Sequence, residues 1–141
     1  MKISYFKVRC FVCFKSFETP CLPDFTYGDG LFVNSTNEFR YFNWLENDIV
    51  IETVDYILSM NPRLQLKNDI TKGGFAQKIV SQLADGDFRI KSGYSKCPRC
   101  KCRFHSYPNR KTTIKEIAVL TFEQMNQLSL DERLNLISDH S

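Results

Sequence analysis

"YSKCPRCKCRFHSY", residues 94–107, is the stretch that decides the fold, because it places three cysteines and a histidine within nine positions. Cys97 and Cys100 have the spacing of one half of a tetrahedral metal site, and such a site needs four ligands. Cys102 and His105 are further candidates within the same stretch. The missing ligands can therefore be sought either beside the pair or elsewhere in the chain.

A second Cys-x-x-Cys pair lies near the N-terminus, in "VRCFVCFKSF", residues 8–17. Runs typical of strands flank both pairs: "ISYFKVRC" and "FKSFE" around the first, "DFRIK" and "CRFHSY" around the second. A Cys-x-x-Cys at the tip of a tight hairpin directs two thiolates and several backbone N–H groups to one point. Two such tips that face each other form a closed tetrahedron of four sulfur ligands.

This pattern resembles the knuckle pair of zinc-ribbon and rubredoxin-like proteins, and "CPRC" resembles their common Cys-Pro-x-Cys knuckle. The resemblance implies one structural zinc ion, held by Cys10, Cys13, Cys97 and Cys100. Two features differ from the usual pattern. Phe14 and Lys101 stand where such knuckles usually carry glycine, and 83 residues separate the pairs, so that an inserted segment would split the ribbon.

The six cysteines also permit other chemistry. Disulfides require an oxidising compartment, and the N-terminus has no uninterrupted apolar stretch typical of a secretory signal. A redox pair is expected to open a helix after a strand, which neither Cys-x-x-Cys does. We expect Cys21 and Cys102 to be ordinary thiols and His105 to end a strand. Whether Cys102 or His105 can replace a zinc ligand stays open.

We expect no enzymatic activity. Four thiolates fill the zinc shell, whereas a catalytic zinc keeps an open position for water. The nucleobase-deaminase pattern needs His-x-Glu, and the only two histidines, His105 and His140, are not followed by Glu at that spacing. The sequence also lacks a recognisable Ser-His-Asp set and a glycine-rich nucleotide loop.

The predicted fold class is α+β: split zinc-ribbon-like β hairpins with an inserted hairpin–helix unit and short C-terminal helices. The length of 141 residues favours a single domain. Its predicted parts are zinc knuckles at 1–20 and 89–110, an inserted α/β subdomain at 21–88, and a C-terminal strand and helices at 111–141.

Within the insertion, residues 31–33 and 38–42 predict a β-hairpin with a turn at 34–37. The segment "ENDIVIETVDYILSMNP" predicts a helix capped by Asn47 or Asp48 and ended by Asn61-Pro62, although its β-branched residues leave a strand at 49–51 open. A second helix is predicted over 75–83, and we read the preceding Lys72-Gly73-Gly74 as its start.

After the second pair, residues 111–120 predict a strand. Two Ser/Thr-x-x-Glu/Gln patterns, Thr121 with Gln124 and Ser129 with Glu132, predict capping boxes. They would begin two short amphipathic helices, "FEQMNQL" and "LDERLNLIS".

Charge is unevenly distributed although the net charge is only +3. Residues 18–55 hold eight acids and one base, whereas residues 89–115 hold nine bases and no acid. The two segments can neutralise each other by packing together, or they can form two faces, one of them suited to an anionic partner.

Two kinds of macromolecular partner follow from these charges. The first expectation is a protein partner, with the chain acting as a small inhibitor or adaptor of the immunity type. Aromatic residues lie among the acids of residues 18–55, and the predicted hairpin carries rings on both faces. The candidate contact residues are Asp29, Glu38, Tyr41, Trp44 and Glu46.

The alternative is nucleic acid, bound by the basic segment 89–115. Arg99, Lys101 and Arg103 project from the second knuckle, and Tyr94, Phe104 and Tyr107 lie among the bases. Four thiolates on Zn²⁺ also attract nearby cations for purely local reasons. Small-molecule substrates have no evident site. No run approaches the roughly 18 apolar residues of a membrane span, so a cytoplasmic location without membrane contact is expected.

Overall fold

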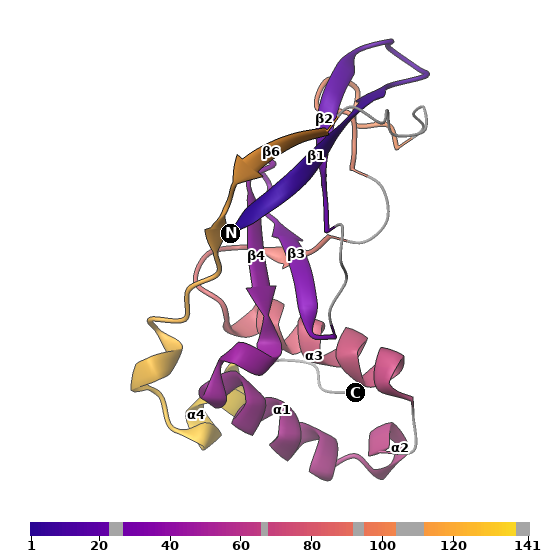
Figure 1. Cartoon of the computed structure of the whole chain (residues 1–141). Coiled ribbons are helices and arrows are strands. Elements are labelled where there is room, and N and C mark those ends of the chain that lie inside the picture. The colour runs from indigo at the N-terminus through magenta and orange to yellow at the C-terminus, as the bar shows by residue number, and fades with distance from the viewer. Residues whose placement is uncertain (23–26, 66–67, 92–94, 104–111, 138–141) are drawn as a thin grey trace. The chain divides into compact units, whose positions relative to one another are not determined.

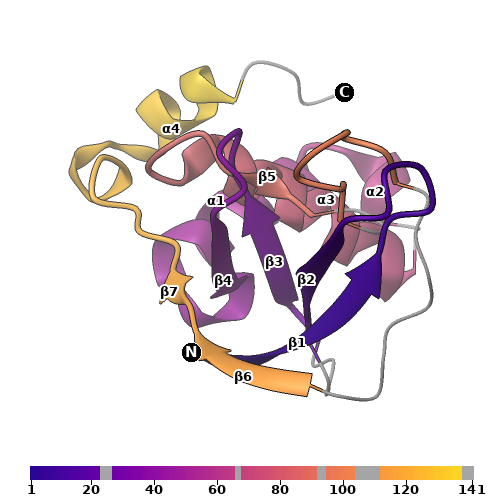
Figure 2. The same ribbon diagram turned by 90° about the horizontal axis from the view of Figure 1, so that it is seen from above.

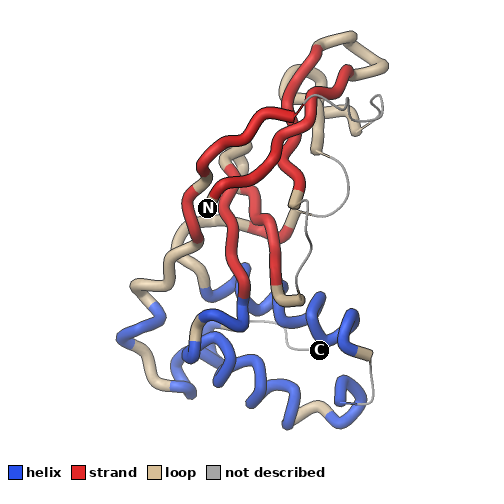
Figure 3. The backbone as a smooth tube through the Cα atoms, viewed as in Figure 1, coloured by secondary structure: helices blue, strands red, loops and turns tan. Residues whose placement is uncertain are grey.

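The computed structural model describes residues 1–22, 27–65, 68–91, 95–103 and 112–137 (Figures 1 and 3). The fold class is α+β, as predicted. The chain divides into two compact units: unit 1 comprises 1–25 and 91–118, and unit 2 comprises 26–90 and 119–141. No helix among the described residues has the length and apolar character needed to cross a bilayer.

Unit 1 is built on a three-stranded antiparallel sheet in the order β2-β1-β6. Strand β1 (Lys2–Arg9) lies between β2 (Ser16–Cys21) and β6 (Thr112–Glu116). Ile3 and Tyr5 turn to one face of β1 and are buried there, whereas Val8, also buried, turns to the other face. The predicted strands on either side of the first cysteine pair are therefore confirmed.

Two polar contacts connect β2 to the later part of unit 1. Glu18 forms an ion pair with Lys115 of β6. Thr19 and Ser95 are both buried, and their hydroxyl oxygens lie 2.5 Å apart. The second contact ties β2 to the segment that leads directly into Cys97, and so helps to set the position of the second cysteine pair.

Unit 2 contains a four-stranded sheet in the order β5-β3-β4-β7. Its centre is the predicted hairpin of β3 (Asp29–Val33) and β4 (Phe39–Asn43), with β5 (Arg89–Ile90) and β7 (Ala118–Val119) outside it. The Asn34 side chain organises the turn, because its Oδ1 accepts hydrogen bonds from the backbone N–H groups of Thr36 and Glu38. The turn at 34–37 is confirmed.

Helix α1 (Asp48–Ser59) follows a single 3₁₀ turn, η1 (Trp44–Glu46). Asn47 caps it, since its side chain accepts from the N–H groups of Ile49 and Val50, so the strand alternative for 49–51 is wrong. Helix α1 ends before Asn61-Pro62, as predicted. Pro62 also begins a short helix, α2 (Pro62–Gln65), which the sequence did not predict. Proline is well suited to the first position of a helix.

Helix α3 (Asp69–Leu83) begins six residues before the predicted start at 75. Asn68 caps it, with Oδ1 accepting from the N–H of Thr71 at 2.9 Å. Gly73 and Gly74 therefore lie inside the helix, and the prediction that they mark its start is wrong. Each glycine costs about 1 kcal/mol relative to alanine in a helix, an amount that packing of the helix on the core can offset.

The predicted strand at 111–120 divides at Ile117 between the two sheets, as β6 and β7. Beyond it, Ser129 and Glu132 form the predicted capping box at the start of α4 (Leu130–Leu136). The other predicted box is wrong: the Thr121 hydroxyl donates to Asp85, whose carboxylate also accepts from the N–H groups of Glu123 and Gln124. Only a 3₁₀ turn, η2 (Met125–Gln127), follows.

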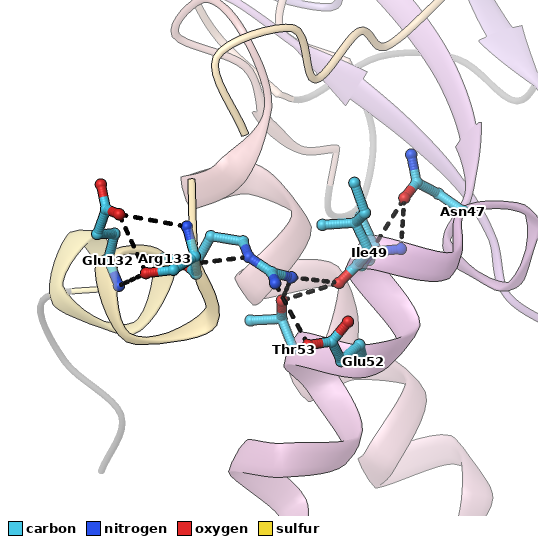
Figure 4. Close-up of polar contacts among 8 residues, drawn as sticks. Asn47, Ile49, Glu52, Thr53, Glu132 and Arg133 are labelled. Atoms are coloured by element: carbon cyan, nitrogen blue, oxygen red, sulfur yellow. Dashed lines mark hydrogen bonds and ion pairs between the residues drawn. The ribbon is translucent and has the colours of Figure 1, made fainter. Parts of the chain in front are cut away.

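The core of unit 2 brings together the inner face of the hairpin, α1, α3 and the C-terminal segment. Its buried members include Phe32, Phe42, Val54, Ile79 and Ile137. Arg133 of α4 is 5% exposed and reaches across to α1, where its guanidinium donates to the Ile49 carbonyl and the Thr53 hydroxyl (Figure 4). This buried arginine anchors the last helix.

Candidate metal centre

The first knuckle is the loop 10–15 between β1 and β2. Two backbone hydrogen bonds close it: the N–H of Cys10 donates to the Lys15 carbonyl at 2.9 Å, and the N–H of Phe14 donates to the Cys10 carbonyl at 3.1 Å. The N–H of Val12 points to the Cys10 sulfur, with an N···Sγ distance of 3.4 Å. The loop thus presents both thiols and a backbone donor to the same point.

The second knuckle, residues 97–102, repeats this pattern 87 residues later. The N–H of Cys97 donates to the Cys102 carbonyl at 2.8 Å, and the N–H of Lys101 donates to the Cys97 carbonyl at 2.9 Å. Each bond has its counterpart in the first knuckle at the same offset. The flanks differ from the prediction, however. Residues 101–103 form no strand, β5 pairs with β3 in unit 2, and 104–107 lie outside the described residues.

The two knuckles of unit 1 face each other across four sulfur atoms. The Sγ atoms of Cys10, Cys13, Cys97 and Cys100 all lie within 4.8 Å of one another. The Cys10–Cys100 and Cys13–Cys97 pairs are each 3.5 Å apart. A tetrahedral ion with metal–sulfur bonds of about 2.3 Å requires sulfur–sulfur distances of roughly 3.8 Å. The cluster therefore has the dimensions of a four-cysteine metal site, and these four predicted ligands come together.

Backbone donors adjust the acidity of the thiols. The N–H of Cys13 is the main cause that lowers the pKa of Cys10. Burial raises the pKa of Cys97, but the N–H groups of Cys100 and Arg99 outweigh it and lower the value to about 6. For Cys100, the N–H of Cys102 lowers the pKa, whereas burial and the other thiols raise it to about 12. A bound cation would displace this last proton.

The cluster is enclosed on one side only. Cys10 and Cys97 are fully buried, Cys13 is half-buried and Cys100 is exposed. Cys102 contributes its backbone to the knuckle and is half-buried, and Cys21 lies at the end of β2. In the described ranges of the chain this is the one group of three or more suitable side chains. His105 lies outside the described residues.

The residues predicted to bind a protein partner do not share one surface. Asp29, Tyr41 and Trp44 are buried, whereas Glu38 and Glu46 are exposed. Tyr41 donates its hydroxyl hydrogen to Asp29 at 2.5 Å. Burial and the Asp29 carboxylate raise the pKa of Tyr41. The rings on both faces of β4 are thus explained by burial on both sides, and not by exposure to a partner.

The residues predicted to contact nucleic acid are accessible. Arg99, Lys101 and Arg103 are all exposed. Tyr94, Phe104 and Tyr107 lie outside the described residues. Sequence reasoning missed the three exposed apolar side chains of the first knuckle: Phe11, Val12 and Phe14. Their place inside and just after a Cys-x-x-Cys was the available signal, because a knuckle directs its cysteines inward and its intervening residues outward.

No protein family model, curated protein or solved structure matches the chain. The assignment of the site therefore stands on its geometry. Four clustered cysteines on two equivalent loops are consistent with a zinc-ribbon-like knuckle pair that can hold one metal ion.

Proposed function

We propose that the cysteine cluster holds one structural Zn²⁺ and that the protein acts without catalysis, by binding a macromolecule. Four sulfur donors in a tetrahedron select zinc or iron, and zinc needs no redox partner. Four protein ligands leave no open position for a substrate or an activated water. The ion would join two loops that are 87 residues apart, so its role is to hold unit 1 together.

We propose further that the macromolecule is a nucleic acid and that unit 1 binds it. The observation that carries this proposal is the division of charge between the units. Residues 1–25 and 91–118 hold twelve Lys and Arg against three Asp and Glu, a balance of +9. Residues 26–90 and 119–141 hold seven Lys and Arg against thirteen Asp and Glu, a balance of −6. A phosphate backbone is the anionic polymer that such a cationic unit attracts.

The charge of the metal cluster does not account for this excess. Four thiolates and one Zn²⁺ carry about −2, which leaves unit 1 with roughly +7. Most of the described cations also face solvent. The exposed ones around the knuckles are Arg9, Lys15, Lys96, Arg99, Lys101 and Arg103. Local balance of the cluster would need only two of them.

The proposal can be tested by the salt dependence of binding. Fluorescence anisotropy with a labelled 12-nucleotide dT strand, at several salt concentrations, should give a linear fall of log K with log[salt]. Reversing three exposed cations of unit 1, R99E/K101E/R103E, should abolish measurable binding while leaving one zinc per chain. The matched control reverses three exposed cations of unit 2, R63E/K78E/R89E, and should keep most of the affinity. Equal losses in both variants would refute a site in unit 1.

A protein partner remains a second candidate, supported by the acidity of unit 2. Among its acids, Glu46, Asp48 and Asp55 are exposed. These side chains suit a basic protein surface, which an inhibitor or adaptor of the immunity type would occlude. Gentle affinity purification from the host, followed by native mass spectrometry, tests it. A defined basic protein retained by the wild type and by R99E/K101E/R103E, but lost by E46K/D55K, would support this candidate over nucleic acid.

A further inference from the structure

The first knuckle exposes three large apolar side chains within four positions. Phe11 is 49% exposed, Val12 57% and Phe14 64%. Single exposed apolar residues are common on protein surfaces and need no explanation. Three of them within one short loop concentrate apolar surface in one place, and concentrated exposed apolar surface is a feature of binding sites. We call the two knuckles, together with the flanking residues Arg9, Lys96 and Arg103, the knuckle tip (residues 9–15 and 96–103).

The loop geometry holds these side chains outward. Cys10 is fully buried at the sulfur cluster, and the hydrogen bonds of the knuckle fix the backbone between the two cysteines. Phe14 is further restrained by Arg9, whose Nε donates to the Phe14 carbonyl at 3.3 Å and whose guanidinium lies 5.5 Å from the ring centroid. A ring presented on a braced loop loses little conformational entropy when a partner covers it.

The second knuckle supplies charge at the equivalent positions. The offset of 87 residues relates Val12 to Arg99 and Phe14 to Lys101. Figures 1 and 2 both show the β1–β2 loop and the orange loop of the second knuckle side by side at one end of the sheet of unit 1, as the clustered sulfurs require. Residues 9–15 and 96–103 hold six cations and no acid. At these equivalent positions the first loop is thus apolar and the second is cationic.

We propose that the knuckle tip binds single-stranded nucleic acid, with bases stacked on Phe11 and Phe14 and the backbone phosphates on Arg99 and Lys101. This inference rests on the proposed function and specifies its substrate class. A single strand exposes the faces of its bases, whereas a duplex buries them in its own stack. Stacking on aromatic rings combined with cationic contacts to phosphate is how proteins bind such strands without reading sequence.

An anionic membrane is the other partner that an apolar tip ringed by cations can suit. The equivalence of the two knuckles argues against it. Arg99 and Lys101 occupy the same positions in their loop as Val12 and Phe14 do in theirs. Insertion of the apolar loop into hydrocarbon would bring these two cations toward the same depth, where burying a charge is costly. The exposed rings and cations of the tip instead suit a nucleic acid, which offers bases and phosphates side by side.

A double-mutant cycle between protein rings and nucleic-acid bases tests the inference in the full-length, zinc-loaded protein. The protein variants are F11L/F14L, which keeps apolar bulk without rings, and F11Y/F14Y, which keeps the rings. The two probes are a dT 12-mer and a 12-mer of abasic sites with the same phosphates. We expect F11L/F14L to bind dT roughly 10- to 100-fold more weakly than the wild type does. The same variant should bind the abasic strand as tightly as the wild type does. F11Y/F14Y should retain affinity for both.

The controls separate failure of this inference from failure of the proposed function. If the wild type binds neither strand nor a dA·dT duplex at low salt, nucleic-acid binding itself is refuted. If the wild type binds dT but F11L/F14L loses nothing, nucleic-acid binding stands and stacking on the tip is refuted. Tighter binding to a dA·dT duplex than to the dT single strand would overturn the choice of substrate. Ring-dependent binding to phosphatidylserine vesicles, with no effect of the rings on dT, would assign the tip to a membrane.

Discussion

Phe14 and Lys101 share a left-handed backbone conformation, with φ of 62° and 63°, at equivalent positions of the two knuckles. Each donates its N–H to the carbonyl of the first cysteine of its own loop. Glycine usually fills this position because a Cβ atom makes the conformation costly, by about 1–2 kcal/mol. Both loops therefore keep the knuckle geometry with a strained backbone at a non-glycine residue.

Replacing either residue by glycine should relieve that strain. For F14G and K101G we expect a rise in the free energy of unfolding of about 0.5–1 kcal/mol each, since the extra entropy of glycine in the unfolded chain offsets part of the gain. Chemical denaturation of the zinc-loaded protein measures it. F14A and K101A are the matched controls, because they remove the side chain but keep the Cβ, and they should show no gain. Stabilisation by alanine as great as by glycine would contradict this account.

The metal prediction concerns which cysteines matter. C10S and C97S should lose the metal and unfold unit 1, since the bound ion contributes of order 10 kcal/mol to folding. C21S and C102S should each retain one zinc per chain, because neither sulfur belongs to the cluster. Elemental analysis after gel filtration gives the stoichiometry. Loss of zinc from C102S alone would show that Cys102 acts as a ligand.

Arg133 should be one of the most sensitive positions of unit 2. Its guanidinium donates to Ser129, Ile49, Thr53 and Glu52, and it is nearly fully buried. R133M keeps the length but leaves buried acceptors without a donor, so we expect a loss of about 2–3 kcal/mol in thermal or denaturant unfolding.

Two matched variants identify which contacts of Arg133 contribute. T53V removes one buried hydroxyl and should cost about 1 kcal/mol. E52Q should cost less than about 0.5 kcal/mol, because the Glu52 side chain is 56% exposed and water screens its ion pair with Arg133. A larger loss in E52Q than in T53V would mean that charge, and not buried hydrogen bonding, holds α4.

Asp85 should make stability depend on pH in the acid range. Burial raises the pKa of Asp85, but the Thr121 hydroxyl and the N–H groups of Glu123 and Gln124 outweigh it and hold the pKa below the usual 3.8. The folded state therefore favours the carboxylate. Its stabilisation is complete above pH 3.8 and disappears as the pH falls through the lower, folded-state value.

The variant D85N should abolish this part of the pH dependence. Because the hydrogen bonds of Asp85 lie at the surface, the effect at neutral pH should stay within about 1 kcal/mol. Comparing denaturation midpoints of the wild type and D85N from pH 7 down to pH 2.5 measures it. The two proteins should converge at the acid end. A constant difference across the range would mean that Asp85 acts through packing and not through its charge.

Local signals in the sequence predicted much of the fold. A cap at Asn47 or Asp48 and a stop at Asn61-Pro62 were enough to predict α1, and the two Cys-x-x-Cys pairs predicted the metal cluster. Long-range partners could not be seen in this way. Asp85, which is 36 residues before Thr121 in the chain, accepts the hydrogen bonds that a local capping box at Thr121 was predicted to make. The apparent strand at 111–120 is likewise divided at Ile117 between two sheets. A pattern confined to neighbouring residues carries no record of such partners.

The exposure of the knuckle tip could not be predicted from the sequence either. Phenylalanine is usually a core residue, and Phe11 and Phe14 are exposed only because Cys10 and Cys13 turn inward to the sulfur cluster. Conversely, Tyr41 and Asp29 looked like surface groups because they are polar, whereas their mutual hydrogen bond allows both to be buried. Hydrophobicity alone assigns both kinds of residue to the wrong side.

The chain passes between the two units three times, after residues 25, 90 and 118. Neither unit is therefore contiguous, and no single truncation releases one of them intact. During synthesis at about 5–20 residues per second, Cys10 and Cys13 would wait roughly 4–17 s for the second knuckle to be made. Unit 2 in turn waits for α4 and Arg133. Each unit is thus completed only when its last segment has been made, and the timing of the metal supply becomes part of how the chain folds.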